Sequence, residues 1–397
     1  MEVKDNALEY VLDYFIHQQG HILMKMQMNR QDTRIRNEVL AIAKDQFALL
    51  KIEKKDIERY LDEFEKYVWG YYILNELIDA RTISDIKCYA YDHIRIKKNG
   101  KRQDAEVRFR NEEDFRRFVS MVATKNEINV SNVNAIQRFA DYTSNPDFIL
   151  RFNISTAWLN MSDVPFIHIR KTPKKKKSVA ELVRRRFMTA EQAEYLCDKA
   201  RNASGMYFTG KGGAGKTTLI NALLEVIPPD KSVGVMQEED ELFSSTHPDM
   251  LFQHVREVQG EGKIQYDMEK LARNGLKLDL DYYILSEITG CEAAAFSIAS
   301  YTGHICWASG HGQNPRDGLM KLADYVKLAT GHDYNDCLKM LTGIEVCVFL
   351  KDWQVHDIEE VTGYDAVNGS LIMRKVELPK PAGPPLEEEE EGIGDDE

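Results

Sequence analysis

The feature that most restricts the fold of this chain is an apolar run that leads into a glycine-rich segment and then into a helical pattern. After Met206–Thr209 comes a full match to the motif G-x-x-x-x-G-K-[S/T], followed by an amphipathic stretch over 217–226. Glycines let backbone N–H groups approach phosphate oxygens, and a helix N-terminus adds favourable partial charge. We therefore predict a P-loop nucleotide site. Its predicted nucleotide-binding residues are Gly210, Lys211, Gly212, Gly213, Ala214, Gly215, Lys216, Thr217 and Thr218.

Two residues of this loop have individual predicted roles. Lys216 is expected to reach the β- and γ-phosphates of ATP, and the Thr217 hydroxyl to ligate Mg²⁺. ATP and Mg²⁺ are thus the predicted ligand and cofactor. A glycine-rich structural turn is the alternative, but the flanking strand and helix disfavour it. The sequence has no Asn-Lys-x-Asp guanine signature, so a GTPase is disfavoured as well.

Beyond the loop, short apolar runs alternate with helical stretches. Runs at Val233–Gln237, Tyr282–Leu285 and Ile305–Ala308 are interleaved with helical patterns that begin near Glu292 and Asp317. Such alternation predicts a buried, mostly parallel sheet with helices on its faces. Residues 344–376 have the pattern of two or three further strands.

The first part of the chain has a different pattern. Residues 2–80 read as helices, and from His93 the period changes to two, with a hairpin predicted at Asn99-Gly100 and a second strand at 107–109. Asn111 is a candidate N-cap, and strands are predicted at 148–154 and 166–170. The fold class is thus an α+β N-terminal domain followed by an α/β, RecA-like P-loop domain. The predicted division is a helical extension 1–80, an α+β domain 81–175, an ATPase domain 176–378 and a disordered acidic tail 379–397.

Charge is unevenly distributed along the chain. The tail from Pro379 to Glu397 carries eight acids and one lysine, so it accounts for most of the net charge of −12. The rest is mildly acidic, which does not indicate a basic face for nucleic acid. The run Lys174–Lys177 is predicted to be a solvated linker; contact with anionic lipid is a hypothesis, which liposome binding that survives replacement of all four lysines by serine would contradict. The six cysteines are scattered, which disfavours disulfides and a zinc site.

An apolar run at Tyr282–Leu285 is followed by a carboxylate, Glu287, about 70 residues after the P-loop. An acid at the end of a strand beside a P-loop can hold Mg²⁺ through a water or activate the attacking water. An ordinary strand-end glutamate is the alternative. The position alone favours neither.

The segments around Glu287 carry a family resemblance. E-I-T-G-C-E-A from Glu287, T-G-H at 302–304 and H-G-Q-N at 311–314 resemble the signature of the type II/type IV secretion ATPase superfamily, roughly G-E-[I/V]-R-G-x-E-A, T-G-H and H-A-N. V-M-Q-E-E-D-E-L from Val235 is similar to its acidic box. The resemblance covers about 70–376 and is greatest to the CpaF/TadA branch, the motors of tight-adherence (Flp-type) pili. Ser286, Thr289 and Gly312 stand where this family usually has Gly, Arg and Ala.

The resemblance implies site roles that the spacing alone does not. Glu287 is the implied catalytic carboxylate, also linked to Mg²⁺ through a water, and the acidic box is implied to lie across the metal site. A histidine box is implied to sense the γ-phosphate, and arginines of the N-terminal domain and its connection to contact the nucleotide. The implied residues besides Glu287 are Glu238, Glu239, His304, His311, Arg151 and Arg170.

The resemblance also implies an assembly and a partner. It implies a cytoplasmic homohexamer, peripheral at the inner face of the inner membrane, that powers pilus assembly or protein secretion through a membrane platform protein. No specific nucleic acid is expected as a partner. A conjugative type IV secretion ATPase is the main alternative; a RecA-like nucleic-acid translocase and a nucleotide-binding regulator without turnover remain as others.

Overall fold

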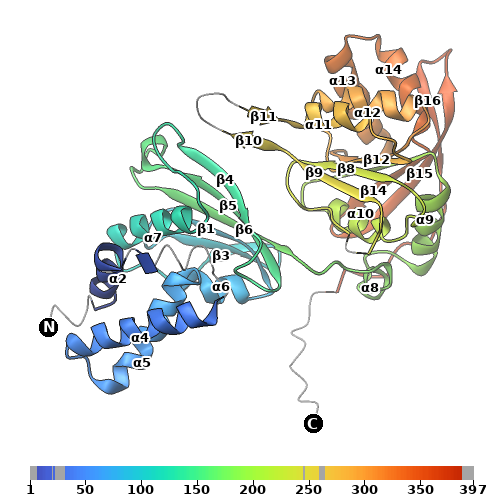
Figure 1. The fold of residues 1–397 in the computed structure, drawn as a ribbon. Helices are drawn as coiled ribbons and strands as arrows, with labels where there is room; N and C mark the ends of the chain where they lie inside the picture. The colour runs from blue at the N-terminus through green and yellow to red at the C-terminus, as the bar shows by residue number, and fades with distance from the viewer. Residues whose placement is uncertain (1–6, 20, 23–31, 245, 259–263, 387–397) are drawn as a thin grey trace. The chain divides into compact units, whose positions relative to one another are not determined.

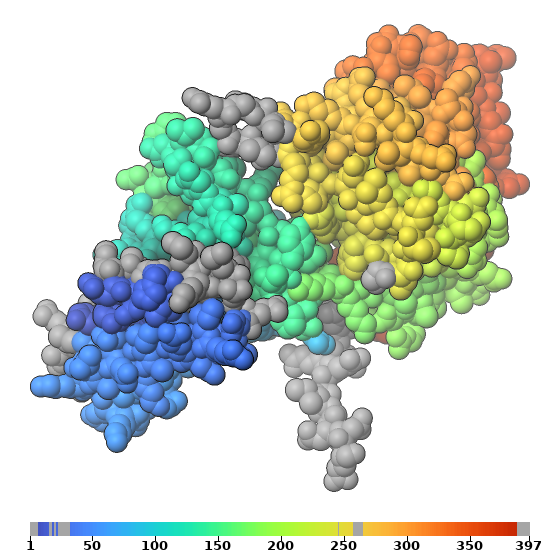
Figure 2. All heavy atoms as spheres, in the orientation of Figure 1, coloured from blue at the N-terminus to red at the C-terminus, as the bar shows by residue number. Residues whose placement is uncertain are grey.

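The computed structural model describes residues 7–19, 21–22, 32–244, 246–258 and 264–386, which form two compact units, Met1–Lys174 and Lys175–Glu397 (Figure 1, Figure 2). Each unit is described by itself. Residues 1–6, 20 and 23–31 of the predicted helical extension and 387–397 of the predicted disordered tail lie outside the described residues. For 379–386 the prediction of disorder is wrong: Lys380 lies 3.0 Å from Asp357, Gln354 donates to the Gly383 carbonyl at 2.8 Å, and the Leu386 N–H donates to the Arg185 carbonyl at 2.9 Å. These contacts hold the start of the tail on the second unit, and low-complexity composition does not reveal them. Within the part of the chain that is described, no helix is both long and apolar enough to cross a bilayer.

The first unit contains a six-stranded antiparallel sheet with the strand order β3-β2-β1-β6-β5-β4 (Figure 1). The helices predicted before residue 80 and the strands predicted at 148–154 and 166–170 are confirmed. The elements are α2 (Ala7–Gln18), α4 (Thr33–Leu49), α5 (Lys54–Val68), η1 (Tyr72–Leu74), α6 (Asn75–Asp79), β1 (Ile83–Cys88), β2 (Ile94–Lys98), β3 (Lys101–Asp104), α7 (Glu112–Lys125), β4 (Ile136–Asp141), β5 (Phe148–Ser155), η2 (Ala157–Leu159) and β6 (Phe166–Pro173).

One hydrophobic core joins the N-terminal helices to this sheet. Phe15, Phe47 and Phe64 from the helices belong to the same buried cluster as Phe115 of α7 and Phe152 of β5. Apolar residues at helical spacing in α2, α4 and α5 therefore form faces that pack into this core. The helical segment is structural scaffold of the first unit, and the predicted boundary at residue 80 stays a prediction.

The hairpin predicted at Asn99-Gly100 is confirmed, but the position of its second strand is wrong. β2 and β3 are joined at Asn99 and Gly100, whose φ angles are 48° and 76°. Positive φ at both central residues defines the two-residue turn that matches strand twist. Val107 and Phe109, predicted as the second strand, lie between β3 and α7, and Phe109 is buried in the core. The Asn111 cap of α7 is confirmed, because its side chain accepts the N–H of Asp114 at 2.9 Å.

The second unit contains an eight-stranded sheet with the order β16-β15-β14-β7-β13-β12-β8-β9 (Figure 1). Neighbouring strands from β14 to β9 are parallel, and β15 and β16 add an antiparallel edge. The mostly parallel sheet predicted from the sequence is confirmed. The elements are α8 (Val179–Arg184), α9 (Ala190–Asn202), β7 (Gly205–Gly210), α10 (Lys216–Leu224), β8 (Val233–Gln237), β9 (Met250–His254), β10 (Arg256–Val258), β11 (Ile264–Tyr266), α11 (Met268–Gly275), β12 (Tyr282–Leu285), α12 (Glu292–Tyr301), β13 (Ile305–Gly310), α13 (Pro315–Thr330), α14 (Tyr334–Met340), η3 (Leu341–Gly343), β14 (Val346–Lys351), β15 (Gln354–Asp365) and β16 (Ser370–Lys375).

Helices cover both faces of this second sheet (Figure 1). On one face α8, α9 and α10 contribute Leu182, Leu196 and Leu223 to a buried cluster with strand residues. On the other face α11 to α14 form a second cluster, which includes Leu271 and Phe296. The strands are buried on both sides, so they read as continuous apolar runs in the sequence. The predicted fold class, an α+β domain followed by an α/β domain, is confirmed.

The carboxyl ends of β7, β8, β12 and β13 meet at one edge of the second sheet, because these strands are parallel. The residues that follow them are the P-loop after β7, the acidic box after β8, Ser286 and Glu287 after β12, and His311 after β13. In open parallel sheets ligands bind at this edge. The sheet thus gathers segments that are 100 residues apart in the sequence.

The lysine run between the units is not the solvated linker that the sequence predicts. β6 continues to Pro173, and the Lys174 ammonium donates to the Asn145 carbonyl at 2.6 Å in the first unit. Lys176 belongs to the second unit, where its ammonium lies 2.7 Å from a Glu225 carboxylate oxygen and its side chain is only 11% exposed. Alternate lysines therefore have fixed partners, which sequence composition alone does not reveal.

Candidate nucleotide-binding site

The glycine-rich loop joins β7 directly to α10. Gly215 precedes α10 with φ of 100°, a left-handed conformation that favours glycine. Space restricts this position as well, because a Cβ on Gly215 would lie 2.6 Å from the Phe187 ring and 3.5 Å from the Trp353 ring. The first N–H groups of α10 have no carbonyl partner within the helix and lie at the loop, which is the arrangement that binds phosphate.

Lys216 lies at the centre of this edge. Its side chain is buried, and its ammonium donates to the Gly210 carbonyl at 3.2 Å and lies 4.0 Å from a Glu287 carboxylate oxygen. Burial lowers the pKa of Lys216, and the carboxylates of Glu287 and Glu241 oppose this effect. An ammonium has three N–H donors, of which the Gly210 carbonyl uses one. The position suits a cation that binds phosphate oxygens.

Glu287 and His311 form a pair beside this lysine. The Nε2 atom of His311 lies 3.1 Å from a Glu287 carboxylate oxygen, and its Nδ1 atom lies 3.3 Å from the Gly210 carbonyl oxygen. Both partners of the ring are acceptors, so a ring nitrogen that carries an N–H can donate to the one that faces it. The side chains are 40% and 51% exposed. The pair is therefore open to solvent water, as a site of hydrolysis requires.

Hydrogen bonds from neighbouring residues fix the loop that carries Glu287. Glu292 is buried, and its carboxylate accepts the backbone N–H groups of Thr289 and Gly290 at 2.5 and 2.8 Å. The Ser309 hydroxyl donates to the Ser286 carbonyl at 2.7 Å. Glu292 belongs to the recognised signature but had no predicted role; it acts as a support that holds the catalytic candidate in place.

The acidic residue that reaches the P-loop is Glu241. Its carboxylate accepts a hydrogen bond from the Thr217 hydroxyl at 3.2 Å. The buried Gln237 side chain accepts the N–H groups of Glu241 and Leu242 at 3.1 and 2.8 Å, which shapes the turn after β8. The prediction did not include Glu241. A signal was present, because Glu241-Leu242 matches the end of the acidic box.

The pair of Thr217 and Glu241 fits a magnesium site. Within the described parts of the chain, no three His, Cys, Asp or Glu side chains gather as a preformed metal site. Mg²⁺ at nucleotide sites usually takes one or two protein oxygens, with waters and phosphate oxygens completing the octahedron. A hydroxyl and a carboxylate oxygen 3.2 Å apart at the P-loop supply that donor set.

The other acidic-box candidates are placed less directly. Glu238 and Glu239 are exposed residues immediately after β8, at the same edge of the sheet. Their role at the metal stays a prediction.

His304 does not join the cluster of Lys216, Glu287 and His311 within this chain. It precedes β13, whereas His311 follows it, so the two histidines lie at opposite ends of one strand. At about 3.3 Å per strand residue they are roughly 20 Å apart. The His304 ring instead packs edge-on to Tyr283, with centroids 6.4 Å apart. Its predicted role in sensing the γ-phosphate stays a prediction.

Arg151 and Arg170 are neighbours in the first unit. They are directly paired across β5 and β6, and Asp85 of β1 pairs with Arg170, so the three residues share one face of the sheet. Arg151 is buried, whereas Arg170 is half-exposed, with its Nε atom 3.8 Å from Asp85. Burial alone would raise the pKa of Asp85. Hydrogen bonds from His168 and Ser84 and the charge of Arg170 outweigh burial, so the pKa is lowered. Nucleotide contact by these arginines stays a prediction.

Comparison with known proteins identifies the family. The profile described as "Type II/IV secretion system protein" matches residues 70–340, which is more than half of the chain. The chain belongs to this family. A putative conjugal transfer protein of Mycobacterium tuberculosis is 32% identical over 107 residues, covering 27% of this chain and 30% of that protein. Protein VirB11 of Agrobacterium fabrum is 29% identical over 164 residues, covering 39% and 46% respectively. The chain thus spans less than half the length of these curated relatives.

Solved structures show the same fold at low identity. The pilus retraction motor PilT with bound ADP has a TM-score of 0.53 and 16% identity, covering 77% of this chain and 81% of that one. The ATPase DotB of Legionella pneumophila has a TM-score of 0.50 and 13% identity, covering 74% and 76%. The arrangement of an N-terminal domain followed by a RecA-like domain is therefore shared with this family of secretion and pilus ATPases.

One departure from the family signature has a steric reason. A Cβ on Gly312 would lie 2.4 Å from the Thr209 hydroxyl oxygen and 2.8 Å from the Gly318 backbone. β7 and the start of α13 thus approach too closely for the alanine usual in the family. No such reason is evident for Ser286 or Thr289.

Gly312→Ala is therefore expected to destabilise the second unit. Overpacking of a close contact costs about 1–3 kcal/mol, so thermal unfolding should begin at a lower temperature. Gly331→Ala is the comparison variant, because no atom lies within 4 Å of a Cβ there and its cost comes from a φ of 73° alone. If calorimetry shows that Gly312→Ala unfolds at the same temperature as the wild-type chain or at a higher one, the packing explanation is contradicted.

Proposed function

We propose that this chain is the ATP-hydrolysing subunit of a pilus-assembly or protein-secretion machine, of the tight-adherence (Flp-type) kind. The observation that carries the proposal is the cluster of Lys216, Glu287 and His311 at the P-loop edge, in a chain that belongs to the secretion family. A cation that binds phosphate and a carboxylate that positions or deprotonates water are groups that ATP hydrolysis uses, and here the imidazole lies 3.1 Å from that carboxylate.

Binding falls to the loop and helix. The backbone N–H groups of Gly210–Thr218 surround the phosphates, and the Lys216 ammonium contacts the β- and γ-phosphate oxygens. Thr217 and Glu241 would hold Mg²⁺, which would neutralise part of the phosphate charge. A bound triphosphate places negative charge beside Lys216, so the ammonium is attracted to the phosphates as well as to Glu287.

Glu287 orients and deprotonates the attacking water. Its Oε1 atom lies 3.1 Å from His311 and 4.0 Å from Lys216, which places the carboxylate beside the cation proposed to bind the γ-phosphate. The water proton passes to the Glu287 carboxylate as the water oxygen attacks the γ-phosphorus, and the bond from that phosphorus to the bridging oxygen breaks, so ADP leaves with the negative charge on its β-phosphate. His311 positions the carboxylate through its Nε2–H and is itself held by the Gly210 carbonyl.

The assembly is proposed from the family alone. A homohexamer would let the arginines Arg151 and Arg170 of the first unit contact nucleotide, and would turn hydrolysis into movement between units by ligand-biased closure. The partner would be a polytopic platform protein, with the motor peripheral at the cytoplasmic face of the inner membrane. Glu238, Glu239 and His304 are proposed to act at the nucleotide within such a ring.

A conjugative or other type IV secretion ATPase is the second candidate. Relatives named as a putative conjugal transfer protein and as VirB11 favour it. Neighbouring genes discriminate: a prepilin, a prepilin peptidase and paired platform proteins support the tight-adherence machine, whereas a relaxase and coupling protein support conjugation. Nucleic-acid translocation is disfavoured, because the described body lacks the excess of basic residues that such proteins carry.

Glu241→Gln tests the site itself. The change keeps the size of the side chain and removes the charge beside Thr217, so the Mg²⁺ concentration for half-maximal ATP hydrolysis should rise about tenfold or more. The measurement is phosphate release titrated with Mg²⁺ at saturating ATP. Glu194→Gln, an exposed glutamate on α9, is the matched control and should match wild type. An unchanged Mg²⁺ requirement in Glu241→Gln would sink the assignment.

A further inference from the structure

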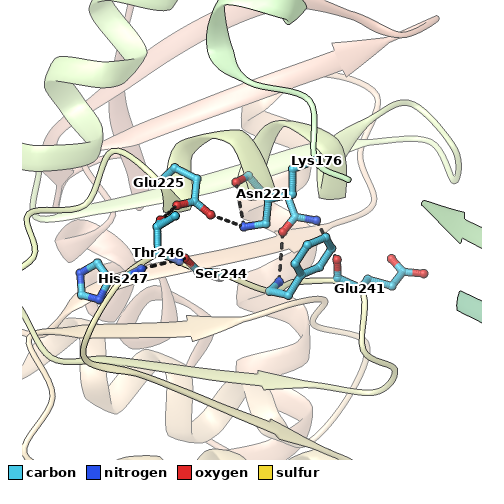
Figure 3. A network of polar contacts seen from close by, with 8 residues as sticks. Lys176, Asn221, Glu225, Glu241, Ser244, Thr246 and His247 are labelled. Atoms are coloured by element: carbon cyan, nitrogen blue, oxygen red, sulfur yellow. Dashed lines mark hydrogen bonds and ion pairs between the residues drawn. The ribbon is translucent and has the colours of Figure 1, made fainter. Parts of the chain in front are cut away.

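The side chain of Lys176 is held by three groups on the second unit (Figure 3). Its ammonium lies 2.7 Å from a Glu225 carboxylate oxygen, 3.5 Å from the Asn221 carbonyl oxygen and 4.7 Å from the centroid of the Phe243 ring. Burial alone would raise the pKa of Glu225, but hydrogen bonds from Lys176 and Thr246 outweigh burial and lower it. The lysine is therefore an ordered part of the fold, although it lies in a run of four lysines.

Two partners of Lys176, Asn221 of α10 and Glu225 at its C-terminal cap, lie on the same face of the helix as Thr217. Thr217, Asn221 and Glu225 are spaced four residues apart, which places them on one face of the helix. At the first of these positions Thr217 donates to Glu241 at 3.2 Å. At the last, Glu225 accepts a hydrogen bond from the Thr246 hydroxyl in addition to the contact with Lys176. The segment of residues 241–244 and 246 thus contacts the helix at Glu241 and at Thr246.

Asn221 fastens the middle of the same segment. Its side-chain amide donates to the Glu241 carbonyl at 2.7 Å and accepts the Phe243 N–H at 3.1 Å (Figure 3). Phe243 is the ring under the Lys176 ammonium. A continuous set of contacts therefore runs from Lys176, through Phe243 and Asn221, to the backbone carbonyl of Glu241, the residue whose carboxylate accepts from Thr217.

We propose that Lys176 is a positioning residue for the magnesium site, which holds the Glu241 segment on α10 and so sets the place of the carboxylate beside Thr217. The proposal rests on the proposed ATPase function. It also assigns a use to the place of Lys176 in the chain, two residues after Lys174, which is bound to the first unit. A movement of residues 174–176 would therefore shift Lys176 and with it the Glu241 carboxylate. By thermodynamic linkage, binding of metal and nucleotide would in turn favour the position of residues 174–176 in which Lys176 keeps its contacts.

A role in stability alone is the competing explanation, and the Mg²⁺ requirement separates the two. Lys176→Met keeps the apolar stem over Phe243 and removes the charge, and Lys176→Arg keeps the charge. Glu225→Gln removes the partner charge from the other side. Lys175→Met is the matched control, since Lys175 is exposed and lies next in the chain.

The experiment measures binding of a fluorescent ATP analogue to the full chain as Mg²⁺ is titrated, together with the melting temperature. The Mg²⁺ concentration for half-maximal binding should rise about tenfold in Lys176→Met and in Glu225→Gln, as for other supports of metal ligands. The double variant, Lys176→Met with Glu225→Gln, should show no larger a rise in the Mg²⁺ requirement than either single variant, because both changes remove the same interaction. Lys176→Arg and Lys175→Met should stay within about twofold of wild type.

Two results would overturn the proposal in distinguishable ways. If Lys176→Met and Glu225→Gln lower the melting temperature but leave the Mg²⁺ requirement unchanged, Lys176 is structural only. If Lys176→Met does not fold, Glu225→Gln decides by the same criterion. If the wild-type chain itself does not bind the analogue, the proposed ATPase function fails, and the inference built on it fails with it.

Discussion

Replacing Lys216 with alanine is expected to abolish both ATP binding and ATP hydrolysis. The ammonium lies between the Gly210 carbonyl and Glu287 at the N-terminus of α10, where phosphate oxygens are expected. A hydrogen bond to a charged group contributes about 1.5–3 kcal/mol. Loss of two such bonds, to the β- and γ-phosphates, corresponds to roughly a 10²–10⁴-fold loss in affinity. Equilibrium binding of a labelled ATP measures it.

The variant should remain folded, which makes the result interpretable. Burial lowers the pKa of Lys216, so its charge is held there at an energetic cost that alanine removes. Glu287 is 40% exposed and can be solvated by water once its neighbour is gone. Lys277→Ala, at an exposed lysine of the second unit, is the matched control. ATP affinity within threefold of wild type in Lys216→Ala would contradict the assignment of the loop.

Replacing Glu287 with glutamine is expected to abolish turnover and spare binding. Glutamine keeps the shape and can still contact His311, but it cannot accept the proton of the attacking water. General-base catalysis contributes about 10²–10⁴-fold to rate, so phosphate release should fall by that factor. The affinity for ATP should stay near that of wild type, which distinguishes this variant from Lys216→Ala.

The control for this change is Glu194→Gln, which removes the charge of an exposed glutamate on the same unit. It should hydrolyse ATP at the wild-type rate. Wild-type turnover in Glu287→Gln would show that another group activates the water, and the exposed Glu238 and Glu239 after β8 would be the next residues to test.

The edge of the site could be predicted because strand ends are visible in a sequence. Buried parallel strands are short apolar runs, and the residue after each run lies at the shared carboxyl edge. This reasoning placed the P-loop and Glu287 in one region, and the family resemblance added His311. In the structure a Glu287 carboxylate oxygen lies 3.1 Å from His311 and 4.0 Å from the Lys216 ammonium. The same reasoning, applied to the ends of β13, would have separated His304 from His311.

Contacts that depend on the path of a turn could not be predicted. Which acid of the box reaches Thr217 depends on the side chain of Gln237, which binds the N–H groups of Glu241 and Leu242. The spacing of residues in the acidic box favours Glu238 and Glu239 equally as the residue at the metal. Glu241 was therefore found only in the structure.

Burial of single charges was also outside the reach of sequence patterns. A run of four lysines has the composition of a solvated linker, yet Lys176 is nearly buried against Glu225 and Phe243. The partners of Lys176 are 45 or more residues away in the chain, so no local signal marks them. The close approach at Gly312 is invisible for the same reason, because it depends on Thr209 and Gly318.

The central claim is that this chain hydrolyses ATP at the P-loop edge, and phosphate release measured beside nucleotide binding tests it most directly. The full wild-type chain should bind ATP and release phosphate in the presence of Mg²⁺, and excess EDTA should stop the release. Binding of ATP with no phosphate release above that of Glu287→Gln would contradict the claim and indicate a nucleotide-binding regulator instead.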